Sequence, residues 1–216
     1  MMVDERAGTL AKMRTGIDVE KERRRRTLTI AVLSALAGVG IAAWSNRADA
    51  SPETSSAGGG DLTSGRLSME GFTQGQIQRI LKVQPLVDQW SKTRGLDPDL
   101  VNGVIWAESR FQTRALSPVG ARGLMQVMPE TQKGWEVETG RTGDIWSPEH
   151  NIFLGTYGLK KLLDRWGGNI PRALASYNWG IGNVMGSPDS YPAVTDQYIE
   201  DVMAARDRFS RARSRP

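Results

Sequence analysis

The sequence predicts an all-α domain, and three observations support that prediction. Apolar residues recur at helical spacing through most of residues 71–209. Proline and glycine stand where helices begin and end, as in "LDPDL" and "DRWGGN". Within that range no segment alternates apolar and polar residues as a half-buried strand does. We therefore expect helices packed on helices.

The expected helices follow in chain order. "TQGQIQRILKV" and "PLVDQWSKTRG" predict two short amphipathic helices that Pro85 separates. A third helix begins with Asp97 as N-cap and Pro98 in its first turn, where proline is tolerated. The glycine-rich stretch 117–131 predicts a tight loop that leads into a short helix.

Three further helices complete the expected domain. One starts at Ser147, contains Pro148 and stops at Gly167 and Gly168. "IPRALASYNWGIG" predicts the next, ending at Gly180, and "TDQYIEDVMAARDRFS" predicts the last, with Thr195 as its cap. We place the end of the domain at residue 209.

The N-terminal part has a different composition. Residues 1–26 are polar and end in "KERRRR", residues 27–44 carry no charge, and Ala48-Asp49-Ala50 resembles an export cleavage site. We assign residues 27–50 to a signal peptide or an uncleaved transmembrane anchor, and residues 51–70 to a flexible linker. The basic flank predicts that the domain is exported to the periplasm, with residues 27–44 as its contact with the cytoplasmic membrane if they are retained.

Composition excludes several kinds of chemistry. The 216 residues include no cysteine and one histidine, His150. Thiol nucleophiles and cysteine or histidine-rich metal sites are therefore excluded, and we expect no metal and no cofactor. The net charge is +4, and arginines gather before residue 27 and in a basic tail, 210–216. We interpret this tail as solvated and predict no nucleic-acid partner, because no recognised nucleic-acid motif accompanies it.

One carboxylate lies on a helix face that the pattern predicts to be buried. Glu108 shares a stripe with Leu100, Val104 and Ile105, close to the C-terminus of the third expected helix. Burial and the negative end of the helix dipole both disfavour the anion, so this carboxyl should hold its proton tightly. A carboxyl protonated near neutral pH is what a general acid needs. The alternative is a structural glutamate paired with Arg110 or Arg122.

Five stretches, taken in order, carry a resemblance to a known family. They are "ESRF", "ALSPVGARGLMQVMPET", "PEHNIFLGTYGLKKLLDRW", "ALASYNWGIGNV" and "YPAVTDQYIEDV". Their order and spacing, over about residues 84–205, closely resemble the soluble lytic transglycosylase (SLT) domain. The resemblance does not reach residues 1–70.

The resemblance implies a lysozyme-like, mainly α-helical domain with a groove for peptidoglycan glycan strands. It implies Glu108 as the single catalytic acid and base. The residues that it implies for substrate binding are Ser109, Gln126, Met128, Tyr177, Asn178 and Tyr198. The chain departs from the family at Val194-Thr195, where many members carry Glu-Thr, and at Ser176, which replaces a common alanine.

The activity that the resemblance implies is cleavage of the bond between N-acetylmuramic acid and N-acetylglucosamine, leaving a 1,6-anhydro end. One alternative is hydrolysis, as in goose-type lysozymes, with Glu130, Glu136, Asp144 or Glu149 as a second acidic group. Another is a peptidoglycan-binding assembly protein. Family members also serve in secretion, conjugation and phage machinery, which are possible partners here.

Overall fold

The computed structural model describes residues 71–214. They form seven helices: α2 (Gln74–Arg94), α3 (Pro98–Ser109), α4 (Pro129–Thr139), α5 (Pro148–Arg165), α6 (Ile170–Trp179), α7 (Ile181–Gly186) and α8 (Ala193–Ser214). The described part contains no strand, and only two isolated β-bridges occur, both in the loop between α3 and α4. The all-α prediction is confirmed for these residues. None of the described helices is long and apolar enough to cross a membrane, and residues 27–50 and 51–70 lie outside the described residues.

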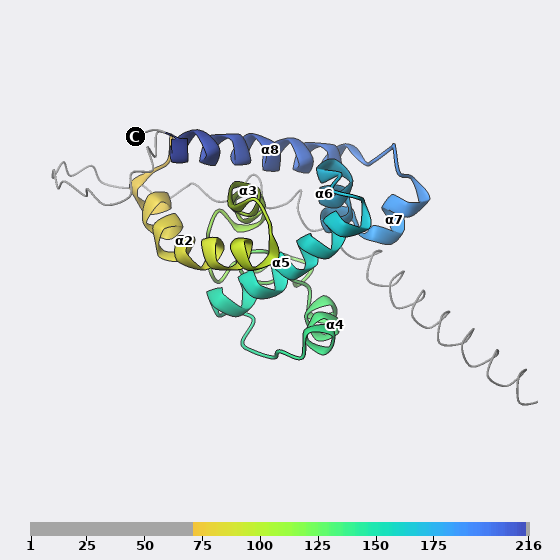
Figure 1. Ribbon diagram of the computed structural model, residues 1–216, viewed down its shortest axis with the longest axis horizontal. Helices are drawn as coiled ribbons and strands as arrows, with labels where there is room; N and C mark the ends of the chain where they lie inside the picture. The colour runs from red at the N-terminus through yellow and green to blue at the C-terminus, as the bar shows by residue number, and fades with distance from the viewer. Residues whose placement is uncertain (1–70, 215–216) are drawn as a thin grey trace, which may run out of the picture.

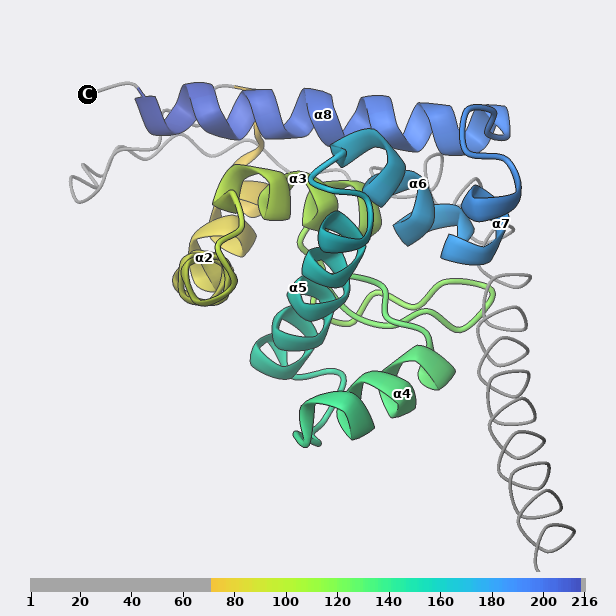
Figure 2. The same ribbon diagram turned by 45° about the vertical axis from the view of Figure 1, so that its right-hand side comes forward.

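Helix α3 lies at the centre of the domain, packed against α8 (Figure 1). A β-carbon on Gly103 of α3 would meet the carbonyl oxygen of Val202 at 2.6 Å, so the two backbones approach as closely as only glycine allows. The main core gathers around α3 and includes Ile80, Leu100, Leu124 and Phe209. Both views place α4 at the end of the domain farthest from α8 (Figures 1 and 2).

The predicted break at Pro85 is wrong, because α2 is one continuous helix with Pro85 inside it. Proline removes one backbone hydrogen bond, at a cost of about 3 kcal/mol in a helix interior. Pro85 lies on the exposed side, where water can solvate the carbonyl left without a partner. Ile80, Val83 and Val87 are buried on the other side and hold both halves against the core.

Of the predicted N-caps, Asp97 is confirmed and Thr195 is wrong. Asp97 accepts a hydrogen bond from the backbone N–H of Asp99, as an N-cap should. Thr195 is not a cap, because α8 begins at Ala193 and Thr195 is buried in its first turn. The short helix α7 was not expected from the sequence.

Helix α8 also continues past residue 209, where we expected the domain to end, as far as Ser214. Ala212 is buried, and Arg213 pairs with Asp99 on α3 at 3.1 Å. The segment interpreted as a solvated tail is thus helical to Ser214, because it still has a buried face.

Candidate active site

Glu108 occupies the last turn of α3 and is 6% exposed. The tyrosine hydroxyl of Tyr198, on α8, donates a hydrogen bond of 2.8 Å to Glu108 Oε1. Leu100, Val104 and Ile105 are buried on the same helix, so the predicted stripe is confirmed. The sequence thus places a carboxylate inside the domain with a neutral hydroxyl as its hydrogen-bond donor.

The environment of Glu108 favours the protonated form. Burial raises the pKa of Glu108 from its ordinary 4.5 to about 8, against a smaller lowering effect of the Tyr198 hydrogen bond. The two arginines considered as partners stack on tryptophans, Arg110 over Trp106 and Arg122 over Trp146. Near neutral pH this carboxyl therefore carries a proton that it can donate.

Two residues with left-handed backbone end α3 directly after the Glu108-Ser109 pair. Arg110 has φ 51° and Phe111 has φ 62°, values that non-glycine residues seldom adopt. The Phe111 side chain is fully buried, which holds the chain in this turn. The turn sends the chain away from the helix axis and into the loop 112–128.

Ser109 fastens that loop to α3. It is 1% exposed, and its hydroxyl lies 2.8 Å from the carbonyl oxygen of Leu124 and 3.1 Å from that of Ile105. Either carbonyl can accept its single proton. In this conformation Ser109 lies behind the surface of the domain, where it ties the loop to the helix that carries Glu108.

Gln126 and Met128 lie at the end of the same loop, and both are half-buried. Gln126 has left-handed backbone, with φ 46°, and its amide Nε2 donates to the carbonyl oxygens of Gly123 and Ala115, at 2.8 and 3.1 Å. Met128 precedes Pro129 at the N-cap position of α4 without a side-chain cap. The amide of Gln126 therefore closes the loop on itself.

Tyr177 joins the loop to α6. Its hydroxyl donates a 2.9 Å hydrogen bond to the carbonyl oxygen of Met125. Burial, with the charge of Glu108 as the next cause, raises the pKa of Tyr177 well above its usual value. The same two causes, in the same order, act on Tyr198. Both tyrosines therefore lie within the electrostatic reach of Glu108 and remain neutral donors.

Asn178 follows Tyr177 and is 3% exposed. The hydroxyl of Thr195, on α8, donates a 3.1 Å hydrogen bond to Asn178 Oδ1. Thr195 and Tyr198 are one helical turn apart, so one face of α8 reaches both Asn178 and Glu108. The structure thus brings Glu108, Ser109, Tyr177, Asn178 and Tyr198 together around α3, α6 and α8, with Gln126 in the adjoining loop.

Sequence reasoning missed Asn151 and the role of Thr195. Asn151 Oδ1 accepts from the backbone N–H of Met125, and its Nδ2 donates to the carbonyls of Arg122 and Ile145. It is 1% exposed, beside buried residues of α5. An asparagine on an apolar helix face was the available signal, since a buried amide needs such partners.

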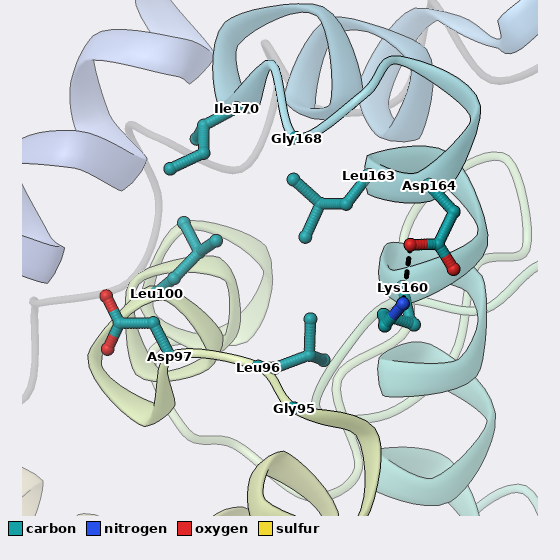
Figure 3. Close-up of a pocket in the computed structure, with 9 residues that line it drawn as sticks. All are labelled: Gly95, Leu96, Asp97, Leu100, Lys160, Leu163, Asp164, Gly168 and Ile170. Atoms are coloured by element: carbon teal, nitrogen blue, oxygen red, sulfur yellow. Dashed lines mark hydrogen bonds and ion pairs between the residues drawn. The ribbon is translucent and has the colours of Figure 1, made fainter.

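A separate hollow lies at the other end of α3 (Figure 3). Its volume is about 280 Å³, and the apolar side chains of Leu96, Leu100, Leu163 and Ile170 point into it. An ion pair between Lys160 and Asp164 stands at its edge. Asp97, the N-cap of α3, also lines this hollow, whereas Glu108 occupies the last turn of the same helix.

Within residues 71–214, no group of three or more histidine, aspartate or glutamate side chains is arranged to hold a metal ion. The groups that the structure places at Glu108 are suited to proton transfer and hydrogen bonding. Glu108 can give and take a proton, and Tyr198 bonds it directly. Asn178 is bonded to Thr195, one helical turn from Tyr198 on α8.

Known proteins resemble this chain in sequence. The chain is 39% identical over 122 residues to a transglycosylase of Enterobacteria phage PRD1, a match that covers 53% of this chain and 42% of the phage protein. It is 35% identical over 115 residues to the membrane-bound lytic murein transglycosylase C of Actinobacillus pleuropneumoniae serotype 5b (strain L20), covering 47% of this chain and 31% of that protein. The chain thus spans less than half the length of these relatives.

Solved structures show the same fold. The lytic transglycosylase Slt of Pseudomonas aeruginosa, in an inactive E503Q form, superposes with a TM-score of 0.59 at 26% identity, covering 66% of this chain and 26% of that one. The family model of the transglycosylase SLT domain matches residues 85–198, which is more than half of the chain and extends from the middle of α2 to Tyr198 on α8. The chain therefore belongs to the transglycosylase SLT domain family.

Proposed function

We propose that this protein is a peptidoglycan lytic transglycosylase that cleaves the N-acetylmuramic acid–β-1,4–N-acetylglucosamine bond. The observation that carries the proposal is the buried Glu108, hydrogen-bonded to the Tyr198 hydroxyl, in an SLT domain. The relatives named as lytic murein transglycosylases support the substrate class. The role of each side chain below is part of the proposal.

The chemistry uses Glu108 twice. Its carboxyl first donates its proton to the glycosidic oxygen, and the bond from that oxygen to C1 of the muramic acid breaks. The 2-acetamido group of the same sugar stabilises the cation that forms. Glu108, now a carboxylate, accepts the proton of the C6 hydroxyl while O6 bonds to C1. The product is a 1,6-anhydro end, no water is consumed, and Glu108 is again protonated.

The environment of Glu108 suits both steps. Because burial raises the pKa of Glu108 to about 8, the proton is present at neutral pH, and the anion left behind is a stronger base than an exposed carboxylate. The Tyr198 hydrogen bond stabilises that anion and keeps it oriented. Ser109, Gln126 and Met128 build the loop beside the acid, and we assign Tyr177 and Asn178 to the substrate-facing side.

Hydrolysis with a second acidic group is the alternative within enzymes. Of the four candidates, Glu136 accepts hydrogen bonds from Gln132 and Gly143 and pairs with His150, and Glu149 pairs with Arg141. Glu130 and Asp144 are exposed. These two engaged carboxylates favour the one-carboxylate mechanism over hydrolysis.

The test is the mass of the products. Purified peptidoglycan is digested with the full protein, and the muropeptides are analysed by mass spectrometry, with Glu108→Gln as the matched control. We expect 1,6-anhydro ends, lighter by one water than hydrolysed ends. Hydrated reducing ends in place of anhydro ends would favour the lysozyme-like reaction. Binding to peptidoglycan without any release of fragments would favour a binding and assembly protein.

We also propose that the protein is exported, with residues 27–50 as signal peptide or anchor and the domain in the periplasm. The apolar run and its basic flank support this, and the named relatives include membrane-bound enzymes and a phage enzyme. A reporter fused after Ala50 should be active only outside the cytoplasm. Activity inside the cytoplasm would contradict the proposal.

A further inference from the structure

We propose that Thr195 is a positioning residue: it fixes the side-chain amide of Asn178 so that its two N–H groups are held for an acceptor oxygen of the bound glycan. This inference rests on the proposed function, because it names a residue that prepares the same site. It does not need Thr195 to touch the substrate. Thr195 acts through the orientation of its neighbour.

The direction of the Thr195–Asn178 hydrogen bond follows from proton counting. Thr195 is fully buried, and its hydroxyl makes no other hydrogen bond within the described residues. A buried hydroxyl needs an acceptor for its single proton, and Asn178 Oδ1, at 3.1 Å, is that acceptor. The opposite orientation would present the amide nitrogen to Thr195 and leave the hydroxyl proton without a partner. Thr195 therefore determines which way the amide faces.

In this arrangement the amide nitrogen of Asn178 has no acceptor among the described residues. It donates to no described residue, and the side chain of Asn178 has no hydrogen bond other than that to Thr195 within residues 71–214. Among the described residues, the fully buried side-chain polar atoms without a partner belong to Trp90, Ser91, Asn102 and His150. The amide nitrogen of Asn178 is not one of them, so it is not fully enclosed. Asn178 is only 3% exposed, so most of its side chain is held by the protein around it. Its amide nitrogen is therefore a donor with a fixed position.

The location of this donor points to the glycan. Asn178 adjoins Tyr177, whose phenol lies within the electrostatic reach of Glu108. Thr195 is one helical turn from Tyr198, which bonds Glu108 directly. Asn178 and Glu108 are therefore bonded by side chains one turn apart on the same face of α8, and the sugar oxygens that can accept the N–H groups of Asn178 are a hydroxyl or the carbonyl of an acetamido group. A donor fixed beforehand loses less conformational entropy on binding than a rotating one.

The decisive experiment couples Thr195 to Asn178. Initial rates on purified peptidoglycan are measured for Thr195→Val, Asn178→Ala and the double variant, all in the full chain. Thr195→Val keeps the size of the side chain and removes the hydroxyl, so we expect kcat/KM to fall about tenfold, as for the loss of one hydrogen bond. In the Asn178→Ala background the same substitution should have no further effect, because the group that it orients is gone. Equal fold-losses in both backgrounds would overturn the inference.

Three controls separate positioning from a loss of structure. Thr195→Ser retains the hydroxyl and should keep kcat/KM within about threefold of the parent. Thr156→Val removes a buried hydroxyl of α5 that donates its single proton to the carbonyl of Ile152 or Phe153 and accepts a hydrogen bond from Arg94 Nε, and should lower Tm without changing kcat/KM. The alkaline limb of the pH–rate profile should stay in place in Thr195→Val, because Thr195 does not contact Glu108. If Thr195→Val does not fold, Thr195→Ala removes the same hydroxyl without adding a methyl group.

A binding measurement keeps this inference distinct from the proposed function. A tetrasaccharide of two N-acetylglucosamine–N-acetylmuramic acid units is titrated into Glu108→Gln protein with and without Thr195→Val. We expect weaker binding, by about tenfold, when the hydroxyl is absent. Unchanged affinity and an unchanged rate would overturn the role of Thr195. A parent that binds the tetrasaccharide but releases no peptidoglycan fragments would contradict the proposed activity alone.

Discussion

Two glutamates of this domain lie in opposite environments. Glu108 on α3 is 6% exposed and accepts one hydrogen bond, from a neutral phenol. The side chain of Glu136 on α4 is 15% exposed, and its Oε1 is the partner of Gln132 Nε2, the Gly143 N–H and His150 Nε2. The same functional group thus has an environment poor in donors at one site and rich in donors at the other.

The consequence is an opposite shift of the pKa. For both carboxyls burial is the largest single cause and raises the pKa. At Glu108 burial prevails, and the pKa reaches about 8. At Glu136 the hydrogen bonds of Gln132, His150 and Gly143 together outweigh burial, and the pKa is lowered. The comparison shows that the balance between burial and hydrogen-bond donors decides which carboxyl can serve as an acid near neutral pH: Glu108 is the more deeply buried and has one donor, whereas Glu136 is partly exposed and has several.

The largest expected effect comes from Glu108→Gln, which keeps the size of the side chain and removes its acid–base chemistry. Loss of general acid catalysis costs about 10²- to 10⁴-fold in rate. Because one residue serves both steps, we expect a loss at the upper end of that range or beyond. The measurement is the initial rate of anhydro-muropeptide release. Near-parental turnover by the folded variant would remove Glu108 from the mechanism.

The same substitution should stabilise the protein in a pH-dependent way. The folded pKa of Glu108, about 8, lies above its ordinary 4.5, so the folded state binds this proton more tightly than the unfolded state. The parent therefore loses stability as pH rises from 4.5 to about 8. Glu108→Gln has no such loss, and its advantage in urea unfolding should grow over that interval and then level off. A constant difference across this range would show that burial does not hold the proton.

Glu136→Gln is the matched variant at the second glutamate. Its effects on stability and on rate should be opposite to those of Glu108→Gln. Replacing the anion weakens the hydrogen bonds that join α4, the 140–147 loop and His150 on α5, and we expect a loss of about 1–3 kcal/mol in stability. Because the folded pKa of Glu136 lies below 4.5, this stabilisation is present above pH 4.5 and is lost as pH falls below it. The anhydro-product rate per folded molecule should stay within about threefold of the parent. A loss as deep as that of Glu108→Gln would instead make Glu136 the second acid of a hydrolase.

Tyr198→Phe removes the hydrogen bond that Glu108 accepts from the phenol, and so tests how much one donor changes the pKa of Glu108. That bond lowers the pKa of Glu108, so the variant should have a pKa above the parental value of about 8. We expect the alkaline limb of the pH–rate profile to move to higher pH, with a fall of about tenfold in kcat at neutral pH, since the anion loses a stabilising donor. A shift to lower pH would show that Tyr198 favours the protonated carboxyl.

The contrast between these glutamates was only partly predictable from the sequence. Glu108 could be found because helical spacing places it with Leu100, Val104 and Ile105, and this is a local pattern. Its hydrogen bond to Tyr198 joins residues 90 positions apart, and no local pattern specifies such a contact. Glu136 was named only as one of four candidates for a second acidic group, and its hydrogen bonds could not be predicted because its partners come from α4, a loop and α5.

Helix boundaries were also only partly predictable from the sequence. The starts at Asp97-Pro98 and Ser147-Pro148 were predicted because capping chemistry is local. The continuity of α2 through Pro85 and the burial of Thr195 depend on which side of each helix faces the core. Tertiary packing decides that, so the sequence predicted a break and a cap where the structure has neither.

The smallest effect is expected at a third carboxylate, Asp97, at the opposite end of α3 from Glu108. Asp97 caps the helix and also pairs with Arg206 of α8 at 2.7 Å, and both groups are partly exposed. Asp97→Ala removes the cap and the pair, and we expect a loss of about 1 kcal/mol, mostly from the cap. Asp97→Asn keeps a capping oxygen and should lose less stability. Its loss therefore measures the contribution of the ion pair with Arg206 separately from that of the cap. Both variants alter the edge of the hollow in Figure 3, and the rate per folded molecule should remain parental because the proton chemistry resides at the other end of the helix. Loss of activity in folded Asp97→Asn would show that a change at the start of α3 affects Glu108 at its end, and that the reactivity of Glu108 depends on more than its hydrogen bond to Tyr198.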